Sequence, residues 1–140
     1  MALVCDTGPL YAAMDSADRD HAVCTELFRT SQEQLVVPAP VVVELDWLAS
    51  KRLDISAFAA FLADIEDGTV KIVELGRLDY KRAREACVAY ADLPLGFVDA
   101  AVLAIVERLG EPKLATLDHR HFRVLRPRHV PSLNLVPDLA

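Results

Sequence analysis

The chain has 140 residues, of which 53% are hydrophobic, a length and composition that suit one folded domain and exclude a largely disordered chain. A formal net charge of −6 at pH 7 argues against a surface that is basic throughout and binds nucleic acid by overall charge. No apolar run approaches the roughly 20 residues that cross a bilayer, and the first residues lack a basic region followed by a cleavable apolar one. We therefore expect a single domain spanning residues 1–140, with no membrane partner.

The three cysteines indicate in which cellular compartment the protein is found. Cys5, Cys24 and Cys87 are an odd number, form no C-x-x-C pair, and each lies in an apolar pattern. Such cysteines are typical of buried free thiols in a reducing environment. The expected location is the cytoplasm.

Short apolar runs alternate with segments of helical periodicity along the chain. The first run ends at Asp6, after which Thr7 is predicted as a helix N-cap and Pro9 as a first-turn residue. Ten of the thirteen residues 97–109 are apolar, which predicts a helix buried on nearly all sides. The predicted strands are 3–5, 35–37, 70–75, 113–117 and 133–136, and the predicted helices are 10–15, 19–30, 39–48, 55–65, 78–90 and 97–109.

This alternation predicts the fold class. Strands that alternate with helices form a mostly parallel sheet covered on both faces and joined by right-handed crossovers. We expect an α/β protein with three layers, α/β/α, around a central sheet of four or five strands. In such sheets, ligands bind at the carboxyl ends of the strands.

Four acidic residues stand in apolar surroundings. Asp6 and Asp118 each follow a predicted strand, whereas Glu44 and Asp99 lie early in apolar helices. Carboxylates are seldom buried unless they are paired or bind a metal. Taken singly, the two strand-end residues could be caps, Asp99 a charge favoured by the helix dipole, and Glu44 a solvated side chain. Taken together they predict a cluster, because the helices that follow parallel strands begin at the same edge of the sheet.

A cluster of four carboxylates has a definite chemistry. The like charges repel, so some carboxylates remain protonated unless a cation compensates them. Oxygen ligands without a His or Cys cluster suit Mg²⁺, or Mn²⁺ in its place, rather than zinc. A metal held in this way activates water for hydrolysis of phosphodiester bonds.

Four pieces of the chain then match one family. They are Cys5-Asp6-Thr7-Gly8, the isolated helical Glu44, the segment 93–100 (LPLGFVDA) and the segment 116–122 (TLDHRHF). With these pieces the whole chain resembles a PIN domain, and in particular the VapC-type ribonuclease toxins of bacterial and archaeal toxin–antitoxin pairs. The resemblance implies a PIN-like fold and an endoribonuclease that hydrolyses RNA and leaves a 3′-hydroxyl.

The resemblance also assigns roles to residues. It implies that Asp6, Glu44, Asp99 and Asp118 bind Mg²⁺ or Mn²⁺ and position the attacking water, with Thr7 and Thr116 supporting these carboxylates. Many relatives carry a second acidic residue near Asp99, where this chain has only apolar neighbours. Asp92 is a candidate fifth ligand, and one or two metal ions remain open.

The segment 119–129 (HRHFRVLRPRH) contains four arginines, three histidines and no carboxylate. It is either a solvated loop or a site for RNA phosphates, which dominate nucleic-acid affinity. Within it, His121 is expected to fix the loop rather than act as a general acid, and Phe122 to fill the core rather than stack on a base. The basic side chains considered for RNA binding are Arg120, Arg123, Arg126 and Arg128, together with Lys51 and Arg52 after the Glu44 helix.

Further expectations concern partners. The apolar stripe of Phe58, Phe61 and Leu62 and the side chain of Trp47 are predicted to pack in the core or between helices. The family also implies a cognate antitoxin, whose amphipathic segment binds a groove between helices, and a homodimer.

Other functions fit the residues less well. A haloacid-dehalogenase-like phosphatase needs a second Asp two residues after the first, where this chain has Gly8. A receiver-like phosphoacceptor needs an acidic pair at the first strand and a Lys where Asp118 stands. A PIN-fold RNA-processing nuclease outside a toxin–antitoxin pair, or a non-catalytic PIN scaffold, remains an alternative.

Overall fold

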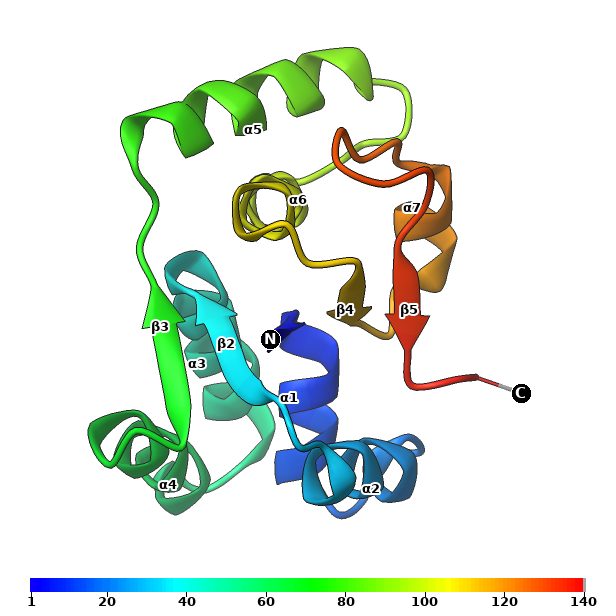
Figure 1. The fold of residues 1–140 in the computed structure, drawn as a ribbon. Coiled ribbons are helices and arrows are strands. Elements are labelled where there is room, and N and C mark those ends of the chain that lie inside the picture. Colours follow the sequence, from blue (N-terminus) through cyan, green and yellow to red (C-terminus); the bar gives the residue numbers. More distant parts are fainter. Residues whose placement is uncertain (140) are drawn as a thin grey trace.

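The computed structural model describes residues 1–139. This part of the chain contains a five-stranded sheet in the order β3-β2-β1-β4-β5, with every neighbouring pair parallel (Figure 1). The strands are β1 (Ala2–Cys5), β2 (Gln34–Pro38), β3 (Val70–Val73), β4 (Lys113–Ala115) and β5 (Asn134–Val136). The helices are α1 (Thr7–Met14), α2 (His21–Thr30), α3 (Ala39–Arg52), α4 (Ile55–Glu66), α5 (Arg77–Ala89), α6 (Phe97–Leu109) and α7 (His119–Val124).

The helices cover both faces of the sheet and make the three predicted layers. From β1 to β3 the chain steps in one direction through α1 to α4, and it then returns over the other face through α5 and α6 to β4 (Figure 1). The middle of α6, from Ala100 to Val106, is buried along its whole length, as its composition predicted. Gly110 ends this helix in the left-handed conformation, with φ of 68°, which glycine adopts without steric cost.

The strand order places a switch point at the centre of the sheet. Connections leave β1 toward β2 on one side, whereas β4 pairs with β1 on the other. Cys5 pairs with Ala115, and the backbone N–H of Asp6 donates to the carbonyl of Ala115 at 2.8 Å. The residues that follow these strands therefore face each other at the carboxyl edge, where parallel α/β sheets bind ligands.

One helix begins earlier than predicted and another was not predicted, and in both cases an Asp at the end of a strand caps the helix. Helix α1 begins at Thr7, and its N-cap is Asp6, whose Oδ1 accepts the Thr7 backbone N–H at 2.8 Å; the assignment of Thr7 as the cap was wrong. Helix α7 was not predicted, yet Asp118 caps it by accepting the His121 backbone N–H at 3.2 Å. A strand-end Asp thus starts a helix in both places.

The buried side chains confirm part of the packing prediction. Phe122 is fully buried in the core, and Phe58 and Phe61 are buried as well. Trp47, however, is 57% exposed, so its expected core position was wrong. The buried face of α3 consists of Val41, Leu45 and Ala49, spaced by four residues, and position 47 lies on the opposite side of such a helix.

Leu62 is also exposed, in contrast to its predicted packing, because it lies at the edge of the helix face that Phe58 and Phe61 bury. Among the cysteines, Cys5 and Cys24 are buried and Cys87 is partly buried, and all three are free thiols. Within residues 1–139, no helix has the length and apolar character needed to cross a membrane.

Candidate metal centre

Asp6 lies at the heart of the carboxyl edge and is only 6% exposed. Its Oδ2 accepts a hydrogen bond from the hydroxyl of Thr116 at 2.9 Å, and its Oδ1 accepts the Thr7 backbone N–H. Burial raises the pKa of Asp6 to about 7, with the negative charges of Asp99 and Glu44 adding to the rise. The two hydrogen bonds oppose this shift, because they stabilise the ionised carboxylate.

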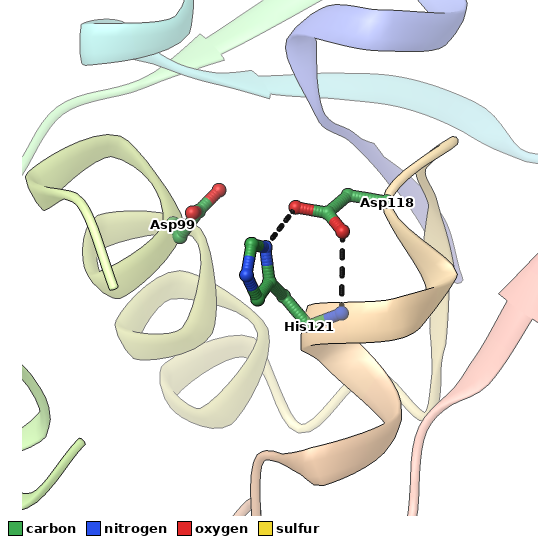
Figure 2. Close-up of side chains that lie close together, drawn as sticks. All are labelled: Asp99, Asp118 and His121. Carbon is green, nitrogen blue, oxygen red and sulfur yellow. Dashed lines mark hydrogen bonds and ion pairs between the residues drawn. The ribbon is translucent and has the colours of Figure 1, made fainter. Parts of the chain in front are cut away.

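A chain of hydrogen bonds connects Asp6 with Asp118. The Thr116 hydroxyl, which donates to Asp6, accepts the backbone N–H of Asp118 at 3.0 Å. Oδ2 of Asp118 then lies 2.6 Å from Nδ1 of His121 (Figure 2). Thr116 is fully buried, and its hydroxyl ties the carboxylate of Asp6 to the backbone of Asp118, whose own carboxylate is held by His121.

Asp99 approaches this pair from the first turn of α6 (Figure 2). Burial raises the pKa of Asp99 to about 6, and the nearby charges of Asp118 and Glu44 raise it further, whereas His121 lowers it. One ligand atom each from Asp99, Asp118 and His121 lies within 4.8 Å of the others. Two carboxylates and an imidazole therefore converge at a distance that one cation can span.

Glu44 completes the predicted set from α3. Its side chain is partly buried, and its charge raises the pKa of both Asp6 and Asp99. The four predicted carboxylates thus come from four different elements and act on one another electrostatically at one edge of the sheet. Carboxylates held together in this way favour a cation between them.

A further oxygen lies beside Asp6. The hydroxyl of Thr7 is buried and has no hydrogen-bond partner among the described residues, and buried polar atoms without a partner are rare in folded proteins. The donor set at this edge is made mostly of oxygen atoms, which fits a hard divalent cation such as Mg²⁺. The hydroxyl of Thr116 forms a hydrogen bond with a carboxylate of the cluster, and the hydroxyl of Thr7 forms none among the described residues.

The other predicted residues lie farther out. Asp92 is exposed and is not in the group formed by Asp99, Asp118 and His121. Arg120 and Arg123 are exposed on α7, next to the cluster in sequence. The Nζ of Lys51 lies 3.3 Å from the ring centroid of Trp47.

Arg52 lies near Tyr11 and Asp15, at the end of α1 away from Asp6. It follows Glu44 by eight residues in α3, roughly 12 Å along the helix. Arg128 forms an ion pair with Glu85 at 2.9 Å.

The sequence did not foresee two features of this edge. The first is the imidazole of His121 beside Asp99 and Asp118; its spacing of three residues from Asp118 becomes informative only once residues 119–124 form a helix. The second is an apolar groove that includes Glu44. It lies between α3 and α6 and is lined by Pro40, Val43, Glu44, Trp47, Phe97 and Val98.

Comparisons with known proteins identify the family and the fold of the chain. The family model described as "PIN domain" matches residues 3–126. Among curated proteins, the chain is similar to Ribonuclease VapC26 of Mycobacterium tuberculosis (strain ATCC 25618 / H37Rv). The two are 34% identical over 125 residues, which cover 89% of this chain and 93% of that protein.

Solved structures share the fold at lower identity. VapC20 of Mycobacterium tuberculosis, a sarcin–ricin loop cleaving toxin, superposes with a TM-score of 0.75 at 20% identity, covering 80% of this chain and 86% of that one. VapBC2 of Rickettsia felis, bound to a promoter DNA fragment, superposes with a TM-score of 0.66 at 16% identity, covering 97% of this chain and 98% of that one. A toxin–antitoxin complex from Klebsiella pneumoniae superposes with a TM-score of 0.65 at 17% identity, covering 94% of this chain and 99% of that one.

Proposed function

The chain belongs to the PIN-domain family, and from this premise we propose that it is a metal-dependent endoribonuclease that serves as the toxin of a toxin–antitoxin pair. The observation that carries the proposal is the convergence of Asp6, Glu44, Asp99 and Asp118 at the switch point of the sheet. A similar protein is named a ribonuclease, which supports RNA as the substrate.

The carboxylates would hold Mg²⁺, or Mn²⁺ in its place. When bound, such an ion supplies a water of lowered pKa and stabilises the charge on the phosphate and the leaving oxygen. Residues of the chain would orient the carboxylates that hold the ion. The Thr116 hydroxyl and the Thr7 backbone N–H each donate a hydrogen bond to one oxygen of Asp6. In the proposed hydrolysis, the oxygen of water would bond to phosphorus as the bond from phosphorus to the 3′ oxygen breaks, and a proton from the water would reach the leaving 3′ oxygen through solvent. The products would be a 3′-hydroxyl and a 5′-phosphate.

Cationic side chains near the cluster would hold the RNA backbone. Arg120 and Arg123 are exposed, and neither forms an ion pair with a carboxylate within residues 1–139. We assign them to phosphate contacts beside the scissile bond. Lys51 and Arg52 lie farther along α3 and would contact the RNA away from the cleavage point.

The antitoxin would occupy a different surface. An apolar groove between α1, α2 and α4 has Leu10, Met14, Phe28 and Phe61 among its lining residues, with Arg29 and Asp64 also present. A groove of apolar walls with both charges suits an amphipathic segment of a partner. Two structural neighbours are toxin–antitoxin assemblies, which supports a partner of this kind.

A second copy of the chain would cover the groove beside Glu44. Val43, Trp47 and Phe97 are exposed there, and aromatic side chains exposed together are typical of interfaces. A homodimer formed through α3 and α6 would place the two metal centres near the interface.

Cleavage of RNA by the isolated chain tests the proposal. The protein is stripped of metal, and a mixed RNA pool is incubated with Mg²⁺ or Mn²⁺, alongside the variants Asp6→Asn and Asp99→Asn. Cutting that needs metal and is lost in both folded variants supports the nuclease. Cutting that persists in the variants would mean a contaminant, and neither cutting nor metal binding would favour a non-catalytic scaffold. Growth arrest on expression, relieved by a co-expressed partner, separates a toxin from an RNA-processing nuclease.

A further inference from the structure

His121 contacts Asp118 through two separate groups. The backbone N–H of His121 lies 3.2 Å from Oδ1 of Asp118, and the imidazole Nδ1 lies 2.6 Å from Oδ2 (Figure 2). A carboxylate accepts hydrogen bonds and donates none when ionised, so Nδ1 carries the proton of this bond. One residue therefore engages both oxygens of the carboxylate and fixes its rotation.

The orientation of Asp118 matters because of its neighbours. Its backbone N–H donates to the Thr116 hydroxyl, which in turn donates to Asp6. These two hydrogen bonds fix the backbone of Asp118, but they leave its side chain free to rotate. The imidazole is the one side chain among the described residues that forms a hydrogen bond with the carboxylate of Asp118.

From this geometry we infer that His121 is a positioning residue for metal binding. Its Nδ1–H holds the Asp118 carboxylate toward Asp99, so that both can face one cation. The inference rests on the metal site of the proposed function. Hydrogen-bond partners of metal-binding side chains typically change metal affinity by about 10- to 100-fold when removed, and we expect an effect of this size.

Two substitutions distinguish the contribution of Nδ1 from that of Nε2. The amide nitrogen of His121→Asn lies near the place of Nδ1 and preserves a donor to Asp118, whereas that of His121→Gln lies near the place of Nε2. Both variants keep the backbone N–H. In calorimetric titrations of metal-free protein with Mn²⁺ alone, we expect His121→Asn to bind within about threefold of the wild type. We expect His121→Gln to bind about 10- to 100-fold more weakly.

A double-mutant cycle shows whether the effect passes through Asp118. In the Asp118→Asn background, where the carboxylate is already gone, His121→Gln should cause no further loss of Mn²⁺ affinity. A full additional loss in that background would overturn the inference. Binding by His121→Gln as tight as that of the wild type would overturn it as well.

Two controls exclude other roles for His121. The melting temperatures of the variants in EDTA should match the wild type, because the ring is partly exposed; a large loss would indicate a structural role instead. Pulsed EPR of bound Mn²⁺ should show no coupling to a directly bonded imidazole nitrogen, and a strong coupling would make His121 a ligand. Wild-type protein that binds no Mn²⁺ would overturn the metal site itself, whereas the outcomes above concern His121 alone.

Discussion

The hydroxyl of Thr116 donates a hydrogen bond to Oδ2 of Asp6 at 2.9 Å, across the junction of β1 and β4. The bond joins residues 110 positions apart in the sequence, and it follows directly from the register that pairs Cys5 with Ala115. The same hydroxyl accepts the backbone N–H of Asp118. Thr116 therefore holds the Asp6 carboxylate and the backbone of Asp118 at the same time.

Replacing Thr116 with Val tests this role. The change keeps the shape of the side chain, removes the donor to Asp6 and leaves the Asp118 N–H without its acceptor. We expect a loss of about 1 to 3 kcal/mol in the free energy of unfolding, measured in urea with EDTA, and a further rise in the pKa of Asp6. Thr116→Ser, which keeps the hydroxyl, is the matched control; equal losses in the two variants would show that the hydroxyl is not what stabilises this junction.

The raised pKa of Asp6 predicts how the metal-free protein responds to pH. Burial lifts this pKa from 3.8 to about 7, so between these values the folded state binds more protons than the unfolded state. Stability therefore falls as the pH rises from about 4 to about 7, by roughly 4 kcal/mol from this group at about 1.4 kcal/mol for each pKa unit. Asp99, with a pKa of about 6, adds a smaller loss of stability over a range of lower pH.

The variant Asp6→Asn should remove most of this pH dependence. In EDTA at pH 8 we expect it to melt at a higher temperature than the wild type, because a buried charge is gone. At pH 4 to 5 the two should melt together. With Mn²⁺ at pH 8 the order should reverse, because the metal stabilises the wild type alone. A wild type that is the more stable protein at pH 8 in EDTA would contradict a buried charge at Asp6.

Substitutions on α7 test the proposed phosphate contacts. Arg120→Gln and Arg123→Gln should each weaken RNA binding. Each should also lower the slope of log affinity against log salt by about 0.7, the value for one phosphate of a single strand. The slope is measured by fluorescence anisotropy with catalytically inactive Asp99→Asn protein. Arg128→Gln is the control, because Arg128 pairs with Glu85; an equal effect of this variant would argue against a specific role of α7.

Trp47 tests the proposed homodimer. Since this side chain is 57% exposed, Trp47→Glu should keep the fold but place a charge in the apolar groove between α3 and α6. We expect a dimer for the wild type and a monomer for the variant by light scattering coupled to gel filtration. Leu62→Glu, on the exposed side of α4, should leave the dimer unchanged. A monomeric wild type would reject the interface.

The sequence predicts the sheet and the cluster because both depend on local patterns. An apolar run that ends in Asp marks a strand end, and parallel strands bring their ends to one edge. Asp6 and Asp118 can therefore be placed together from the pattern of residues alone. Glu44 and Asp99 follow because helices after parallel strands start at that edge.

Trp47 and His121 could not be placed in this way. Hydrophobicity alone does not tell which side of α3 faces the core, and the spacing of Val41, Leu45 and Ala49 decides it. His121 approaches Asp118 only because Asp118 caps a short helix. The short helix is anchored by buried Phe122 rather than by helix-forming composition, so local propensity gives little sign of it.

The most direct test of the metal centre is a crystal structure with Mn²⁺, with the ion located by its anomalous scattering. We predict a peak at the carboxyl edge of the sheet, within coordination distance of Asp6 and Asp99, and the loss of that peak in Asp99→Asn crystals. A peak held by other residues, or no peak in crystals soaked at saturating Mn²⁺, would contradict the assignment of these carboxylates to a catalytic metal.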